Sequence, residues 1–188
     1  IHDCNGTAIT LYGNSSQPGN ILIENNYFWN NMKNAIGAFT TLGRFGHITA
    51  RRSNNVTIRH NSFYQGVPMA STVAGAIPPC FIGANSNTGT NFAMVSGNAF
   101  MIGSGAGATV ARGFYCWLVN GTFTNLPGTG TGFASGVALG HDRNVYFNQG
   151  TGTTFGFVNA TSYTALAQYR VAVSATADLN SIVGDPLY

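Results

Sequence analysis

The sequence predicts an all-β fold in which parallel strands stack as a solenoid, with loops that leave the stack and a short C-terminal helix. A repeated strand pattern and an unusual composition predict it. Only 7% of the 188 residues are charged, whereas charged residues make up roughly 25% of an ordinary soluble domain. Polarity comes instead from Asn, Ser, Thr and 25 Gly, which are unfavourable in helix interiors and favour turns and strands.

One strand pattern, apolar-x-apolar-x-x-Asn-x-Phe, recurs about every 36 residues. Its three copies are 21–28 (ILIENNYF), 56–63 (VTIRHNSF) and 93–100 (AMVSGNAF). The two apolar residues of each copy are two positions apart, which is typical of one face of a strand. The Asn ends the strand, because it tolerates a left-handed backbone and can bond to its own turn. The Phe then returns to the interior.

Stacking the copies as neighbouring parallel strands, about 4.8 Å apart, brings equivalent residues together. We expect an asparagine ladder, an aliphatic stack and an aromatic stack, formed by Asn26, Asn61 and Asn98, by Ile23, Ile58 and Val95, and by Phe28, Phe63 and Phe100. A chain whose neighbours are its own repeats needs few charges. The repeat and the composition therefore predict the same architecture.

Other segments predict the remaining elements. Strand-like sequence lies at 35–41, 46–49, 114–119 and 137–139. Glycine-rich sequence predicts loops at 83–90 and 125–136. Proline cannot donate to a central ladder, so a further excursion is expected at Pro68, Pro78 and Pro79.

The C-terminal part is expected to close the same domain. The segment 161–173 predicts a helix that Thr161 or Ser162 caps. We expect parallel coils over 1–150 and a capping segment of the same domain over 151–188. The chain starts at Ile1 without a Met, directly in strand-like sequence, which we interpret as a processed or truncated piece.

The charge balance indicates which partners suit the chain. A net charge of +3 gives a weak preference for anionic partners. The basic residues form no long run and match no reader motif, so no nucleic acid is expected and an acidic polysaccharide suits the balance better. No apolar run reaches the roughly 18 residues that span a bilayer, so no membrane span is expected.

Cysteine usage leaves two interpretations open. Cys4, Cys80 and Cys116 are odd in number and contain no Cys-x-x-Cys pair. Either all three are small buried residues, or one disulfide leaves a free thiol.

The three copies resemble the repeats of right-handed parallel β-helix proteins, the pectate-lyase-like superfamily. The segment 178–188 (DLNSIVGDPLY) looks like the Asp-x-Asn-Ser-Ile-x-x-Asp-Pro-Leu-Phe ending common in that group. There, an Asn-Val-Tyr-like strand and a short helix precede the ending, and 144–147 and 161–173 hold those places. The resemblance covers 1–103 and 141–188 and implies the C-terminal portion of such a β-helix.

That superfamily includes polysaccharide lyases, glycoside hydrolases, uronan epimerases, and the tailspikes and adhesins of bacterial viruses. The resemblance therefore implies a carbohydrate partner and a secreted, cell-surface or virion location. An oligomer of identical chains is compatible with it. It selects no reaction and no cofactor, because a fold does not determine a function.

Candidate catalytic residues come from the outward columns of the repeat. Glycoside hydrolysis usually needs two carboxylates, and the chain has only five acidic residues, of which two belong to the ending. Polysaccharide lysis by β-elimination instead needs a cation beside the uronate and a base. We expect Glu24 and Arg59 to be stacked neighbours beside His60, and these three residues are the catalytic candidates. The alternative is a surface ion pair worth at most about 1 kcal/mol next to a solvated histidine.

Substrate-binding candidates are basic or aromatic. Arg51 and Arg52, with His47, precede the catalytic candidates by one side of a coil. Trp29 and Tyr64 share an outward column and offer rings on which sugars stack, as does Tyr27, whereas Trp117 lies in an apolar run and is expected in the core.

A second polar cluster, 141–143 (HDR), is either a histidine oriented by a carboxylate or a polar turn. A metal site made from this cluster with His2 and Asp3 would need distant coils to meet, so no metal site is expected. Two hypotheses remain: a polysaccharide-directed protein that is lyase-like or depolymerase-like, and a non-catalytic structural or adhesive component of a fibre or filament.

Overall fold

The computed structural model describes residues 1–4, 6–12, 19–31, 46–51, 53, 55–67, 80–86, 92–104, 113–119, 141–150, 155–158, 161–173 and 177–185. Its strands form three sheets. All strand pairings described are parallel except that of β13 with β14. The prediction of an all-β chain with parallel strands is confirmed.

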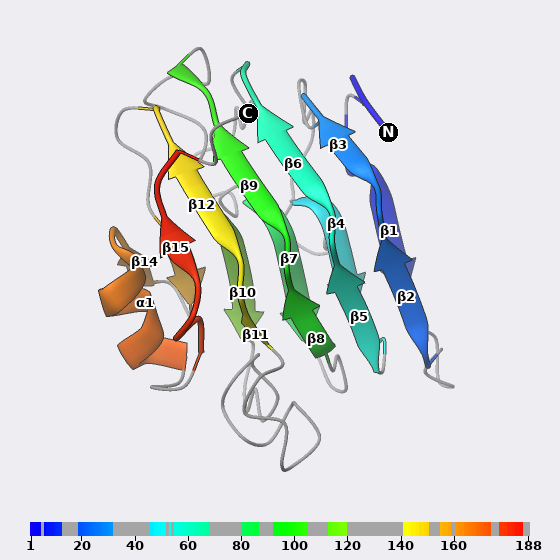
Figure 1. Ribbon diagram of the computed structural model, residues 1–188. Helices are drawn as coiled ribbons and strands as arrows, with labels where there is room; N and C mark the ends of the chain where they lie inside the picture. The colour runs from blue at the N-terminus through cyan, green and yellow to red at the C-terminus, as the bar shows by residue number, and fades with distance from the viewer. Residues whose placement is uncertain are drawn as a thin grey trace.

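From β1 to β13, successive strands belong to the three sheets in turn, so each repeat adds one strand to each sheet (Figure 1). The first sheet contains β1 (Ile9–Tyr12), β4 (Gly46–Arg51), β7 (Cys80–Ser86), β10 (Tyr115–Val119), β13 (Gly156–Val158) and β14 (Thr161–Tyr163). The second contains β2 (Ile21–Glu24), β5 (Val56–Arg59), β8 (Phe92–Ser96) and β11 (His141–Asp142). The third contains β3 (Tyr27–Trp29), β6 (Ser62–Gln65), β9 (Ala99–Ile102), β12 (Val145–Asn148) and β15 (Ile182–Val183).

The register of the sheets confirms the predicted aliphatic and aromatic columns. Ile23 pairs with Ile58, which pairs with Val95, and all three are buried. The ring centroids of Phe28 and Phe63 are 4.8 Å apart at an interplanar angle of 8°. Those of Phe63 and Phe100 are 4.8 Å apart at 16°. The inward residues thus build the core by stacking like on like along the repeat.

The asparagine ladder is also confirmed. The Nδ2 of Asn26 donates to the Oδ1 of Asn61 at 3.1 Å, and the Nδ2 of Asn61 donates to the Oδ1 of Asn98 at 3.1 Å. Each of these acceptor oxygens also receives the backbone N–H of the preceding rung, at 3.0 Å. Because Asn61 and Asn98 are buried, the ladder satisfies polar groups at the bend between the second and third sheets that water does not reach.

A fourth copy of the repeat extends the ladder, and the sequence pattern did not reveal it. Asn98 donates through Nδ2 to the Oδ1 of Asn144 at 3.2 Å. Tyr146 stacks on Phe100 with centroids 5.4 Å apart at 6°, and His141 pairs with Val95. The copy was missed because His141 occupies an aliphatic position and Tyr146 occupies the Phe position.

Two sequence predictions are corrected. The loop expected at 83–90 is wrong for its first residues, because β7 runs to Ser86. Gly83 pairs with Thr49 on one side and Cys116 on the other, and pairing on both edges outweighs the weak strand propensity of Gly and Asn.

The predicted helix is shorter than expected. Its first residues, Thr161–Tyr163, form β14, and α1 spans Leu166–Val173. Neither Thr161 nor Ser162 caps it. These two residues pair with the edge of β13 as part of β14 and so precede the helix. At the start of the helix, Thr164 instead donates its backbone N–H and its hydroxyl to the Oε1 of Gln168, at 3.1 and 3.0 Å.

The strands expected at 46–49 and 114–119 are confirmed within β4 and β10. Those at 35–41 and 137–139, the loop at 125–136 and the prolines at 68, 78 and 79 lie outside the described residues. Of the cysteines whose side chains are described, Cys80 is buried, Cys4 is half-buried, and neither forms a disulfide. The described part of the chain contains no helix that is long and apolar enough to cross a membrane.

Candidate functional site

The outward face of the third sheet carries aromatic side chains. Residues on either side of the buried Phe column point away from the core, because side chains alternate along a strand. One outward column is Tyr27, Ser62 and Ala99, and the next is Trp29, Tyr64 and Met101. The most exposed rings of this face come from β3, in which Tyr27 is 52% and Trp29 45% exposed.

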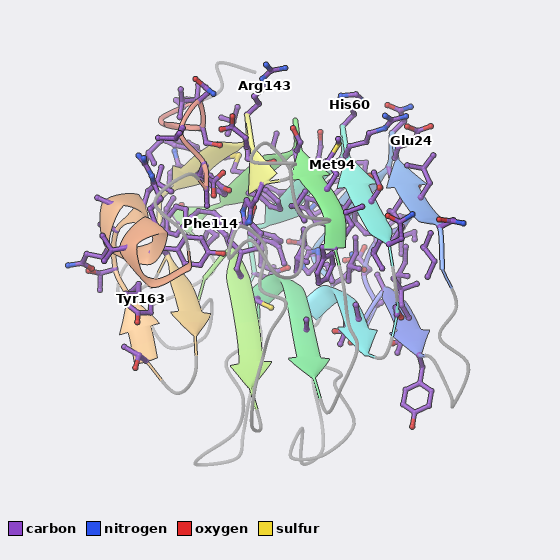
Figure 2. The ribbon with its side chains drawn as sticks, turned by 90° about the horizontal axis from the view of Figure 1, so that it is seen from below. Glu24, His60, Met94, Phe114, Arg143 and Tyr163 are labelled. Atoms are coloured by element: carbon purple, nitrogen blue, oxygen red, sulfur yellow. The ribbon has the colours of Figure 1, made fainter. Side chains whose placement is uncertain are left out.

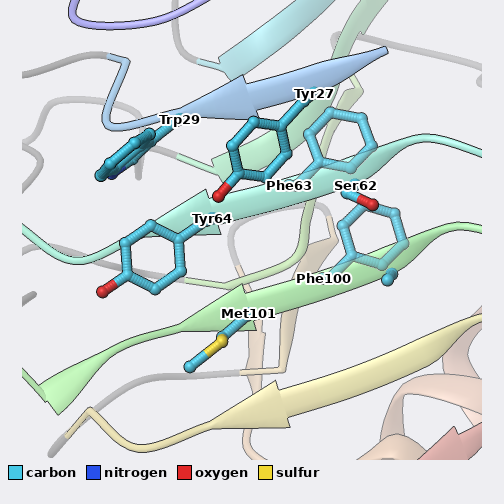
Figure 3. A pocket seen from close by; sticks show the side chains of 8 residues that line it. Tyr27, Trp29, Ser62, Phe63, Tyr64, Phe100 and Met101 are labelled. Atoms are coloured by element: carbon cyan, nitrogen blue, oxygen red, sulfur yellow. The ribbon is translucent and has the colours of Figure 1, made fainter. Parts of the chain in front are cut away.

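These side chains surround a hollow of about 410 Å³. Phe63 and Phe100, which alternate with the outward residues along β6 and β9, also line it (Figure 3). The lining residues are Tyr27, Trp29, Ser62, Phe63, Tyr64, Ala99, Phe100 and Met101. We call the outward ones among them, without the two phenylalanines, the aromatic surface.

The rings of the aromatic surface lie at angles to one another. The centroids of Tyr27 and Trp29 are 6.0 Å apart with planes at 51°. Those of Trp29 and Tyr64 are 6.1 Å apart with planes at 76°, so the edge of one ring meets the face of the other. Such tilted pairs are favourable for aromatic rings. Together they form an uneven surface that presents both ring faces and polar groups, rather than a flat apolar one.

The three catalytic candidates lie beside this surface, at the bend before the third sheet. The Nε of Arg59 donates to the Oε2 of Glu24 at 2.7 Å, so the predicted stacking of these two residues is confirmed. His60 is exposed and has a left-handed backbone with φ of 54°. Glu24, His60 and Arg143 line one edge of the molecule, whereas Phe114 lies inside it (Figure 2).

The left-handed backbone of His60 belongs to a column that runs the length of the ladder. Asn25, Gly97 and Arg143 precede the other ladder asparagines and have φ values of 57°, 65° and 57°. A side chain on Gly97 would collide with the His60 ring, since a Cβ there would lie 2.7 Å from the ring Cδ2. The bend therefore needs glycine or a residue that tolerates this conformation.

Of the two basic substrate-binding candidates, Arg51 and Arg52, the structure describes only the backbone of Arg51. Arg51 ends β4 opposite Tyr12 in the first sheet, and Arg52 lies outside the described residues. His47 is fully buried against Phe63 and Phe81. The expectation that it belongs to a polar surface cluster is wrong, because the residues around it in β4 are all buried and the ring turns inward. Burial lowers the pKa of His47 to about 4, although a hydrogen bond with Gln65, at 2.8 Å, opposes this.

A buried polar cluster at the C-terminal end was not expected. The Nε2 of His141 lies 3.0 Å from the Oδ2 of Asp178, an ion pair when the imidazole is protonated, and both side chains are fully buried. The other carboxylate oxygen, Oδ1, accepts from Tyr146, Asn144 and Ser181 at 2.9, 3.2 and 2.5 Å. Burial alone would raise the pKa of Asp178, but the charge of His141 and the hydrogen bonds lower it below 3.8.

This cluster resolves the second polar motif of the sequence. Asp142 does not orient His141, since its two oxygens accept from the backbone N–H and the side chain of Asn180, each at 2.7 Å. Arg143 forms the left-handed turn. To find the His141–Asp178 pair from the sequence, one would have to align 141–146 with the repeat and accept polar residues at its core positions. Because solvent does not reach it, the pair supports the fold.

The site thus consists of an exposed aromatic surface beside a short charged edge, both positioned by the repeat. Comparison of the chain with protein-family models, with curated proteins and with solved structures finds no match.

Proposed function

We propose that this chain is a stretch of right-handed parallel β-helix that binds polysaccharide through the aromatic surface of its third sheet, outside the cell or on a virion. The observation that carries the proposal is the hollow of about 410 Å³ between Tyr27, Trp29 and Tyr64. Its volume lies in the range of about 300–1,000 Å³ that small ligands occupy.

The chemistry of the lining suits sugar rings. Tyrosine and tryptophan combine an apolar ring face with one polar tip, and a sugar ring likewise combines an apolar C–H face with a polar rim. Ser62, which pairs with Tyr27, adds a hydroxyl to the lining. The repeat also presents equivalent positions about every 4.8 Å, which suits a ligand that is itself a repeating chain.

Binding without catalysis fits the site better than lysis. The described residues that line the hollow include no carboxylate, imidazole, lysine or arginine. At the neighbouring edge, Glu24 neutralises Arg59, so that arginine is not left to neutralise a substrate. We therefore propose an adhesin-like or tailspike-like role.

A direct test measures binding to a panel of soluble polysaccharides containing polygalacturonate, alginate, dextran and galactomannan. We expect at least one to bind, and we expect Trp29→Ala to weaken that binding about tenfold, or about 1.4 kcal/mol. The matched control is Leu22→Ala, which removes another half-exposed side chain from the second sheet. A panel without any binder, or equal losses in both variants, would contradict the proposal.

Lyase activity has its own test, because only Asn61 separates Arg59 and His60 from Ser62, which lines the hollow. If the chain cleaves a uronan by β-elimination, unsaturated product accumulates, and the double variant Arg59→Ala, His60→Ala abolishes it. If the wild-type chain binds the uronan but releases no unsaturated product, its role is non-catalytic.

A further inference from the structure

We infer that Tyr64 is the principal stacking platform of the aromatic surface, and that Gly66 and Gly103 are positioning residues that hold its ring flat. The inference rests on the proposed polysaccharide binding and specifies which ring a pyranose lies against. Under this inference two glycines, rather than another side chain, help determine the affinity for polysaccharide.

The geometry at the end of β6 carries the inference. A Cβ on Gly66 would lie 2.7 Å from both Cε1 and Cζ of Tyr64 and would also collide with its hydroxyl. A Cβ on Gly103 would lie 2.9 Å from the same hydroxyl. The Tyr64 ring therefore lies directly over the backbone of Gly66, and its hydroxyl end reaches over Gly103 in the next repeat.

This support leaves one ring face available to a ligand. Gly66 lies against the hydroxyl end of the Tyr64 ring, and the plane of Trp29 meets that ring at 76°. Tyr64 also lines the hollow, so the face turned away from Gly66 borders it. A pyranose whose apolar C–H face lies parallel to the sheet fits such a platform.

Pre-ordering distinguishes Tyr64 from the other rings. Tyr27 and Trp29 are about half exposed, and fixing an exposed side chain on binding costs conformational entropy. The Tyr64 ring already rests against two backbone segments. Its contribution to binding is therefore reduced less by the cost of ordering.

The glycines offer a clean experiment. The φ of Gly66 is outside the left-handed region, so alanine fits its backbone, and the three atoms nearest to a Cβ there all belong to Tyr64. Gly184→Ala is the matched control, because nothing lies within 4 Å of a Cβ added there. We expect Gly66→Ala and Tyr64→Ala each to weaken binding of the best polysaccharide of the panel about tenfold, and Gly184→Ala to leave it unchanged.

The double variant tests whether Gly66 acts through Tyr64. Gly66→Ala should add nothing in the Tyr64→Ala background. Without any ligand, the proton NMR signal of the Gly66 Hα should be shifted upfield by the ring and lose that shift in Tyr64→Ala.

The outcomes separate the two proposals. If Trp29→Ala weakens binding while Tyr64→Ala and Gly66→Ala do not, polysaccharide binding stands and the platform is wrong. A Gly66→Ala loss that persists without Tyr64 also overturns the platform. A wild-type chain that binds no member of the panel overturns both.

Discussion

The same core column is aliphatic in the first repeats and polar at the C-terminal end. Ile23, Ile58 and Val95 fill it in β2, β5 and β8. His141 follows in β11, and Asp178, whose backbone N–H donates to the carbonyl of His141 at 2.6 Å, comes last. Neighbouring positions thus have the same geometry and opposite polarity.

The difference shows how the stacks end. An internal rung of the ladder is satisfied by the next asparagine, but the partners of Asn144 toward the C-terminal end are an aspartate and a serine. Its Nδ2 donates to Asp178, and its backbone N–H donates to the Oγ of Ser181 at 2.8 Å. Asp178 also accepts from Tyr146, the last ring of the Phe column. One buried carboxylate therefore terminates the ladder and the aromatic stack together.

Two buried histidines, His47 and His141, also differ between the earlier repeats and the C-terminal end. His47 lies in the second repeat among phenylalanines and bonds to the neutral side chain of Gln65. His141 lies in the fourth and faces the carboxylate of Asp178. Burial without an opposite charge favours the neutral imidazole of His47, whereas the buried partner of His141 is a carboxylate. The two ends should therefore respond differently to substitution and to pH.

The largest effect is expected from Asp178→Leu. It removes the carboxylate that faces His141 and that accepts from the hydroxyls of Tyr146 and Ser181. We expect a loss of about 3–5 kcal/mol in the free energy of unfolding, measured in urea. His141→Leu combined with Asp178→Leu should recover part of this loss, because it continues the aliphatic column. Asp3→Asn, at an exposed pair with His2, is the control. A loss no larger than in this control would refute the structural role of Asp178.

The next largest effect is a pH dependence from His47. Its pKa falls from 6.5 in the unfolded chain to about 4 in the folded one, so between these values the unfolded chain binds the proton and the folded chain does not. Stability should therefore fall by about 3 kcal/mol as pH decreases from 6.5 to 4.

Two comparisons sharpen this pH measurement. His47→Phe, which matches the neighbouring ring of Phe81, should remove most of the slope. Asp178 has a lowered pKa, so its contribution is fully present above 3.8 and is lost only as pH falls further, through its folded pKa. An unchanged slope in His47→Phe would show that other groups cause it.

A smaller effect is expected at an internal rung. Asn61→Leu removes an amide whose Nδ2 donates to Asn98 and to the carbonyls of Ile23 and Arg59. We expect a loss of about 1–3 kcal/mol, seen as a lower melting temperature. Asn25→Gly keeps the left-handed turn and should change it little. An unchanged melting temperature in Asn61→Leu would reject the ladder as a source of stability.

The smallest effect is expected at the charged edge. Glu24→Gln removes the partly exposed ion pair with Arg59 and should cost at most about 1 kcal/mol, less at high salt. Denaturation at low and high salt measures it. A loss comparable to that of Asn61→Leu would mean that the edge, and not the ladder, dominates this bend.

Much of the fold could be predicted because a repeat spaces equivalent residues evenly along the chain. That spacing determines register, and register places Asn61 on Asn98 and Arg59 on Glu24. The outward column of Trp29 and Tyr64 follows from the same alternation. A pattern that expects apolar core positions, however, could not find His141 or place His47 inside.

The amino-acid sequence by itself determined the parallel strands, the ladder and which residues share a face, because these depend on local alternation and on one repeating interval. Tertiary structure alone decided which polar groups lie in the core, where the stacks end and how the Tyr64 ring rests on Gly66. Those features depend on contacts between side chains and backbone of different repeats, whose distances and solvent exposure no periodicity encodes.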